Sequence, residues 1–282
     1  MYLADTGETI YKKNRLSSCR KFKYLQCSDF INYVVDKIKH DSWSPDACVG
    51  VAINSGMFKR SEIVCTKTLY HYIDIDLLLV KNIDLPLKLR RNNKSVRVKK
   101  HKKKLGKSIE ERPEHISSRE EFGHWEIDTV IGEKSNNDYA LLTLVERKTR
   151  NAIIRKIESK TASSVIKEIK NIQDFFGDKF SEIFKTITSD NGLEFADLAT
   201  LENFTDTKVY FTHPYSSFEK GTNERHNGLI RRFIPKGKRI SNYNLDQILF
   251  IEDWMNTLPR KILKYKTPEE LFDNHLNEIY CI

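Results

Sequence analysis

The chain has 282 residues and a formal net charge of +9, which suits a polyanionic partner. No stretch approaches the roughly 20 apolar residues of a membrane span. The N-terminus also lacks the basic-then-apolar order of a secretory signal. The five cysteines are odd in number and irregularly spaced, which argues against a disulfide framework or a paired C-x-x-C zinc site. We therefore expect reduced thiols in a cytoplasmic protein.

Residues 1–84 have the pattern of short helices. Apolar side chains recur at helical spacing over residues 30–38, after Ser28, which is suited to cap the helix. Ser44 is followed by a proline, the order of an N-cap and the first helical position, so a second helix is expected to run to about Ile53.

A third helix is expected over residues 67–80, capped by Thr66. Three short helices with a turn at Gly56 resemble a helix-turn-helix unit that contacts DNA. An ordinary three-helix packing module is the alternative. The candidate DNA-contacting face carries Lys67, Thr68, Tyr70 and His71.

Residues 85–115 read as a basic linker. Between Lys88 and Lys107 there are eleven Lys and Arg residues and no acidic residue. Like charges at this density repel one another and favour an extended chain. We expect this segment to contact the DNA backbone, with a passive tether as the alternative. The DNA contacts are assigned to Lys99, Lys100, Lys102, Lys103 and Lys104.

Residues 116–282 alternate between strand and helix patterns, which supports an α/β class. Strands are expected over residues 125–132, 139–146, 151–157, 185–188 and 207–211. Helices are expected over residues 161–177 and 194–202, around Glu224, over 244–259 and from Thr267 onward.

Three acidic residues stand out because of their surroundings. Asp128 and Asp190 lie at or near the ends of β-branched runs, and Glu224 begins a helical pattern. A carboxylate on a half-buried strand is costly to desolvate unless a cation or donor compensates it. Three such acids meeting in the fold would form an oxygen-only site of the kind that Mg²⁺ or Mn²⁺ prefers.

The chain also contains four longer stretches in a set order: GHWEIDTVIG (123–132), LVERKTR (144–150), TSDNGLEFA (188–196) and HPYSSFEKGTNERHNGLIRRFIPKG (213–237). Together they resemble the DDE transposases of bacterial insertion sequences, within the retroviral-integrase-like superfamily. The spacing of 33 residues between Asp190 and Glu224 matches the insertion-sequence family numbered thirty.

This resemblance implies a ribonuclease-H-like mixed five-stranded sheet with flanking helices, as a catalytic core after the small all-α region. It implies DNA strand cleavage followed by transfer of the 3′-hydroxyl into target DNA. Asp128, Asp190 and Glu224 would be the catalytic residues and the ligands of two Mg²⁺ or Mn²⁺ ions. The partners would be double-stranded DNA, both the terminal inverted repeats of the element and the target, bound by a homo-oligomer at the bacterial nucleoid.

Other polar residues near the three acids have supporting roles in this interpretation. Glu126, Glu194 and Glu219 are competing carboxylates, which we expect to be solvated or paired. Asn191, Asn223 and Asn227 are expected to orient the ligands or water from behind. A cationic edge suited to DNA phosphate is formed by Arg231, Arg232 and Lys236.

The N-terminus departs from the family pattern. Members carry a further helix-turn-helix ahead of the Trp43 region, whereas this chain begins with residues that resemble the segment just after it. A catalytically silent DNA-binding remnant, or an inhibitor of transposition, is therefore an alternative function. A plain nuclease of the ribonuclease-H type is a third hypothesis, which the helical region and the basic linker disfavour.

Overall fold

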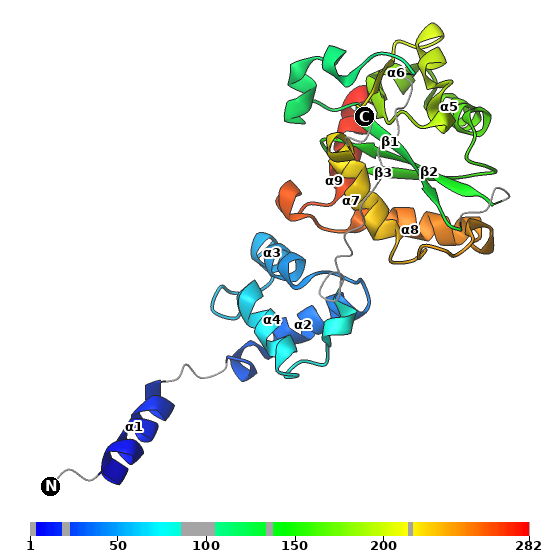
Figure 1. Ribbon diagram of the computed structural model, residues 1–282. Helices are drawn as coiled ribbons and strands as arrows, with labels where there is room; N and C mark the ends of the chain where they lie inside the picture. Colours follow the sequence, from blue (N-terminus) through cyan, green and yellow to red (C-terminus); the bar gives the residue numbers. More distant parts are fainter. Residues whose placement is uncertain (1–3, 19–22, 86–104, 134–137, 214–216, 282) are drawn as a thin grey trace. The chain divides into compact units, whose positions relative to one another are not determined.

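In the computed structural model the described residues are 4–18, 23–85, 105–133, 138–213 and 217–281 (Figure 1). The chain divides into two compact units, residues 1–90 and 91–282. Within these described ranges no helix is long and apolar enough to cross a membrane.

The first unit is helical. Its helices are α1 (Ala4–Ser18), α2 (Ser28–Lys39), α3 (Pro45–Ser55) and α4 (Thr66–Asp74). The apolar face predicted for α2 is buried against α3 and α4, with Phe30, Cys48 and Leu69 at the centre of the core. Helix α1 was not predicted, because its few apolar residues form no continuous stripe.

The predicted N-terminal caps of these helices are confirmed only for α3. The Ser44 hydroxyl accepts a hydrogen bond from the Ala47 N–H at 3.1 Å and caps α3 as expected. Ser28 and Thr66 are instead the first residues of their helices, and the cap positions belong to the cysteines before them. Boundaries of one residue are the least certain part of a sequence pattern.

Helix α4 is shorter than the predicted 67–80. It ends at Asp74, and Asp76 then adopts a positive φ of 52° that turns the chain back toward the helix. Leu78 and Val80 are buried while Leu79 between them is exposed. This alternation is typical of an extended segment, so these apolar residues reach the core by a non-helical path.

The second unit contains a five-stranded sheet. Its strands are β1 (His124–Ile131), β2 (Ala140–Glu146), β3 (Ala152–Ile157), β4 (Thr186–Ser189) and β5 (Lys208–Phe211). Their order in the sheet is β3-β2-β1-β4-β5. β2 pairs antiparallel with both β1 and β3, whereas β4 runs parallel to β1 and β5. This mixed order is that of the ribonuclease-H-like fold and agrees with the predicted strands.

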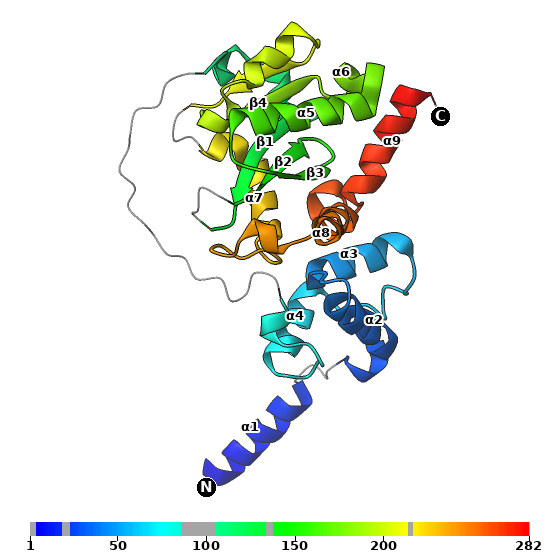
Figure 2. The ribbon, with the colours of Figure 1, turned by 90° about the vertical axis from the view of Figure 1, so that its right-hand side faces the viewer.

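Helices cover both faces of the sheet (Figures 1 and 2). One face packs against α5 (Ala162–Phe176), α6 (Phe180–Ile183) and α9 (Pro268–Tyr280), around the fully buried Trp125. The other face packs against α7 (Gly221–Ile230) and α8 (Leu245–Thr257), around Val130 and Met255. Alternate residues of β1 therefore point toward two different cores, which explains why Trp125 and Asp128 lie on opposite sides of the sheet.

Residues 193–203 form two 3₁₀ segments, Leu193–Phe195 and Leu198–Asn203, instead of the predicted α-helix over 194–202. The buried residues Phe195, Leu198 and Leu201 are three positions apart. That spacing keeps them on one face of a 3₁₀ helix, which has three residues per turn.

Part of the segment that we assigned to the linker is packed on the second unit. The carbonyl of Lys107 accepts a hydrogen bond from the N–H of Phe211 in β5 at 2.8 Å. Lys107 Nζ also lies 2.6 Å from Glu202. The folded second unit thus includes residues ahead of the expected boundary at residue 116.

Candidate active site

The sheet register brings Asp128 and Asp190 to the same level. β1 and β4 run parallel with Glu126 opposite Thr188, so Asp128 and Asp190 each lie two positions further along. Asp190 is the first residue after β4, and its Oδ1 accepts a hydrogen bond from the Gly192 N–H at 2.9 Å. The two carboxylates therefore approach each other where β4 ends beside the middle of β1.

A lysine lies between these two carboxylates. Lys220, which is 4% exposed, has its Nζ 3.5 Å from Asp128 Oδ1 and 4.0 Å from Asp190 Oδ2. The same ammonium donates to the carbonyl of Ile127 at 3.0 Å. Burial raises the pKa of Asp128; the charge of Lys220 opposes this shift, and that of Asp190 adds to it. Two carboxylates this close need a cation if both are to stay ionised.

Helix α7 reaches the site through Asn227. Its Nδ2 donates to Asp128 Oδ2 at 2.8 Å, and its Oδ1 lies 3.3 Å from the hydroxyl of Thr143 on β2. The Asp128 carboxylate is thereby held in one orientation by a neighbouring helix and strand. Such support from behind is typical of metal-ligating carboxylates.

The other two asparagines have different surroundings. The buried Asn191 uses its amide on backbone groups, accepting from the Leu105 N–H and donating to the Thr212 carbonyl. Its contacts fix the loop that follows Asp190. The side-chain amide of Asn223 is fully buried and makes no hydrogen bond with any described residue.

Glu224 lies on the first turn of α7, and its side chain is exposed. Among the described residues its carboxylate does not gather with those of Asp128 and Asp190 within 4.8 Å. It stands three residues before Asn227, close to one helical turn. The structure thus places the carboxylates of Asp128 and Asp190 beside the same lysine. Glu224 is connected to them only because it belongs to the same helix as Asn227, which contacts Asp128.

The competing acid Glu126 is committed elsewhere. It is 0% exposed, and its Oε1 lies 3.2 Å from Arg147 Nε. Its Oε2 accepts a hydrogen bond from the Asn223 N–H at 3.1 Å. Because Asn223 is in the first turn of α7, Glu126 meets one of the free N–H groups of the helix N-terminus. Glu126 therefore fixes the start of α7 against β1.

Glu194 and Glu219 are likewise paired. Glu194 Oε1 lies 2.8 Å from Lys160 Nζ and 3.1 Å from the hydroxyl of Thr129. Glu219 accepts from the His213 backbone N–H and contacts its Nδ1, both at 2.8 Å. These two acids stabilise the loops around the site.

Two of the three basic residues proposed to contact DNA after α7 make contacts within the fold. Arg231 donates to the carbonyl of Ile131 at 2.6 Å, and the Arg232 guanidinium lies 4.8 Å from the centre of the Trp254 ring. Burial lowers the pKa of both guanidinium groups. Lys236, in the turn beyond, is exposed.

In the first unit Lys67 and His71 are exposed on α4, while Thr68 is partly buried with its hydroxyl 3.2 Å from Cys65 Sγ. The five lysines assigned to the DNA backbone lie outside the described residues: Lys99, Lys100, Lys102, Lys103 and Lys104.

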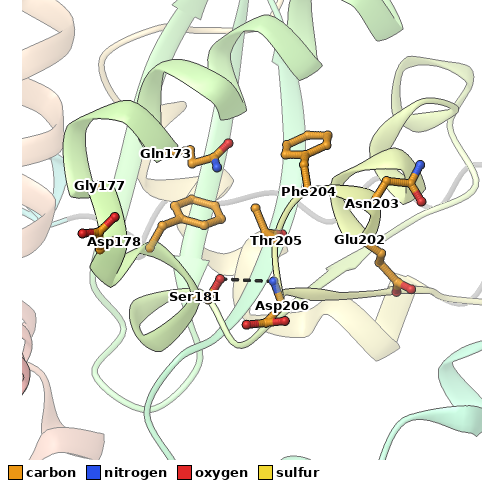
Figure 3. A pocket seen from close by; sticks show the side chains of 10 residues that line it. Gln173, Gly177, Asp178, Ser181, Glu202, Asn203, Phe204, Thr205 and Asp206 are labelled. Atoms are coloured by element: carbon orange, nitrogen blue, oxygen red, sulfur yellow. Dashed lines mark hydrogen bonds between the residues drawn. The ribbon is translucent and has the colours of Figure 1, made fainter.

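A hollow on the second unit lies apart from the carboxylates (Figure 3). It lies between the end of α5 and the segment before β5, where Ser181 accepts a hydrogen bond from the Asp206 N–H at 3.2 Å. Its lining includes Asp178, Glu202 and Asp206. Three acidic residues disfavour binding of DNA phosphate, so we place no site there.

The residues at the aspartate pair fit a divalent cation. The available donors are carboxylate and amide oxygens, which are the ligands that hard cations prefer. The ammonium of Lys220 also stands between the two carboxylates, which shows that the site accepts positive charge there. A ribonuclease-H-like sheet with acids at this level is the arrangement of an integrase-type core.

Comparison with known proteins agrees with this class. Residues 118–217 match the family model of the integrase core domain. The chain is 44% identical over 208 residues to "Probable transposase for insertion-like sequence element IS1161" of Streptococcus salivarius, covering 74% of this chain and 58% of that protein. It is 41% identical over 170 residues to the transposase for insertion sequence element IS4351 of Bacteroides fragilis, covering 60% and 50%. The chain is thus similar to transposases of bacterial insertion sequences, and it spans about half the length of these relatives.

Lys220 is the site residue that the sequence analysis did not identify. A partial signal was its position in the stretch that contains Glu224, since Lys220 directly precedes Gly221, the first residue of α7. Its burial between two acids depends on the sheet register, which the local sequence does not specify.

Proposed function

We propose that this chain catalyses DNA strand cleavage and 3′-hydroxyl strand transfer as part of an insertion-sequence transposase. The observation that carries the proposal is the position of Lys220 between Asp128 and Asp190. β1 and β4 place the carboxylates of Asp128 and Asp190 around one buried cation, in a region that matches the integrase core model.

Asp128, Asp190 and Glu224 would hold the divalent metal, for which we propose two Mg²⁺ or Mn²⁺ ions. Such ions, when bound, activate the attacking oxygen and stabilise charge on the leaving oxygen. Asn227 orients the Asp128 carboxylate for this task, and Glu126 keeps the start of α7, and with it Glu224, against β1. The names of the relatives support an insertion-sequence substrate.

The DNA partners would be the terminal inverted repeats and the target duplex, bound by a homo-oligomer in the bacterial cytoplasm. We assign backbone contacts to Lys236, Arg231 and Arg232 in the second unit and to the lysines of the basic linker. Residues Lys67, Thr68 and His71 of α4 would contact DNA from the first unit. The net charge of +9 supports this assignment through counterion release.

Nicking of supercoiled plasmid tests the proposal without knowledge of the element ends. The full chain is expected to nick the plasmid with Mg²⁺ or Mn²⁺ and not with EDTA. Asp128→Asn, Asp190→Asn and Glu224→Gln should each lower the rate by at least about a hundredfold, since each removes a charge that stabilises the transition state. Binding of the same plasmid at matched salt should change little.

Glu194→Gln is the matched control, because Glu194 is an acid near Asp190 that is paired with Lys160. It should retain most of the nicking activity. Normal nicking by the Asp190 variant would contradict the assignment of the three acids. Tight DNA binding with no metal-dependent nicking by the unaltered chain would instead favour a silent DNA-binding protein. Strand transfer is then measured with duplexes taken from the DNA that flanks the gene.

A further inference from the structure

A second group of metal-ligating side chains lies at the opposite end of β1 from Ile131. His115 belongs to the 3₁₀ segment Glu114–Ser118, Glu121 lies in the turn that follows, and His124 is the first residue of β1. Their ligand atoms all lie within 4.8 Å of one another. We refer to these three residues as the His-Glu-His cluster. It shares no residue with the proposed catalytic site.

The distances within the cluster suit a small cation. Glu121 Oε2 lies 3.2 Å from His115 Nε2 and 3.1 Å from His124 Nε2. Two ligands bound at about 2.0–2.1 Å in tetrahedral geometry lie roughly 3.3 Å apart. Two of the three ligand pairs already have this separation. The third pair joins the two imidazoles, and His115 can adjust because its side chain is 63% exposed.

Two of the ligands are also held from behind. The hydroxyl of Thr186 on β4 lies 2.9 Å from His124 Nδ1, the ring nitrogen that faces away from the cluster. Lys185 Nζ lies 2.8 Å from Glu121 Oε1 and leaves Oε2 directed at the histidines. Metal-ligating histidines usually bond their second nitrogen in this way, which sets the tautomer and the ring orientation.

We propose that His115, Glu121 and His124 bind one divalent transition-metal ion, with Zn²⁺ as the expected occupant and water in the fourth position. Two imidazoles and one carboxylate are a ligand set that zinc accepts with one position open. Mg²⁺ favours oxygen ligands, so this site and the aspartate pair select different ions. Bound zinc would link the 3₁₀ segment to the start of β1.

The test is a zinc titration of the full chain after removal of metals, with a chromogenic chelator as competitor. The unaltered chain should bind one more equivalent of Zn²⁺ than His115→Ala or Glu121→Gln, or bind it at least tenfold more tightly. His115 is exposed, so its replacement should leave the fold intact, which circular dichroism verifies. His275→Ala is the matched control: His275 Nδ1 contacts Glu278 at 2.9 Å, but no third ligand among the described residues completes that pair.

Asp128→Asn should leave zinc binding unchanged, so this proposal can fail or hold independently of the transposase assignment. Imidazole NMR gives a second readout. Zinc should shift the Nε2 resonances of His115 and His124 and leave those of His275 in place. Equal zinc affinity and stoichiometry in the unaltered chain and the His115 variant would overturn the proposal, as would a zinc-induced shift confined to other histidines.

Discussion

Replacing Glu126 by glutamine tests whether this acid supports the fold or belongs to the catalytic group. The wholly buried carboxylate lies 3.2 Å from Arg147 Nε and accepts from the Asn223 N–H. In Glu126→Gln the amide oxygen can still accept from Asn223, but the charge opposite Arg147 is lost. Removing one partner of a buried ion pair costs about 3–5 kcal/mol, because the other charge stays buried.

We therefore expect Glu126→Gln to lower the free energy of unfolding of the second unit by about 3–5 kcal/mol. Urea unfolding followed by tryptophan fluorescence measures this. Trp43 lies in the first unit, so a Trp43→Phe background leaves Trp125 and Trp254 to report on the second. The midpoint of the transition should fall while its slope stays the same.

The double variant Glu126→Gln with Arg147→Met is the control. It removes both buried charges and should recover at least half of the lost stability, apart from the hydrogen bond from Arg147 to the Ile116 carbonyl. A change below about 0.5 kcal/mol for Glu126→Gln would refute the structural role. If that stable variant had also lost metal-dependent nicking, Glu126 would be a metal ligand.

Three further predictions concern neighbouring contacts. Lys220→Met should make the thermal midpoint rise more steeply with Mg²⁺ than in the unaltered chain, because it removes a cation that competes for the same carboxylates; equal slopes would contradict this. The hydrogen bond with Glu219 raises the pKa of His213. The stabilisation from this pair is therefore complete below the unfolded pKa of about 6.5 and is lost as the pH rises through the folded pKa. An NMR titration should show a lower pKa for His213 in Glu219→Gln, and an unchanged pKa would contradict this. Gly132→Ala should destabilise the second unit by about 1–3 kcal/mol in urea unfolding, because the added Cβ would overlap the Lys238 carbonyl; an unchanged midpoint would show that this turn is free to move.

The sequence predicts the five strands of the sheet and the capped helix α3, because these depend on local signals. Alternating and β-branched runs place β1 to β5 within one or two residues, and Ser44 with Pro45 marks the start of α3. The predictions that are wrong concern segments whose conformation depends on tertiary packing. Helix α4 ends early because Leu78 and Val80 reach the core as an extended segment, and residues 193–203 adopt 3₁₀ geometry to keep a three-residue spacing of buried side chains.

The candidate site divides in the same way. Asp128, Asp190 and Glu224 are predicted from their local motifs, which need no knowledge of the fold. The contacts of Lys220 and Asn227 cannot be found that way, since each joins residues about 30 to 100 positions apart in the chain. Only the pairing of β1 with β4 and the packing of α7 on β1 bring them together.

Glu126 and Asp128 lie two residues apart on β1, but the fold gives their carboxylates different surroundings. Glu126 is fully buried, but Arg147 and the first turn of α7 compensate its charge. Asp128 is less buried, yet desolvation raises its pKa, and Lys220 at 3.5 Å opposes that shift without abolishing it. A carboxylate that stays under-compensated costs stability and persists where a cation can bind it. The difference between these two neighbours, more than the presence of acids on the strand, supports our proposal that Asp128 and not Glu126 binds the metal.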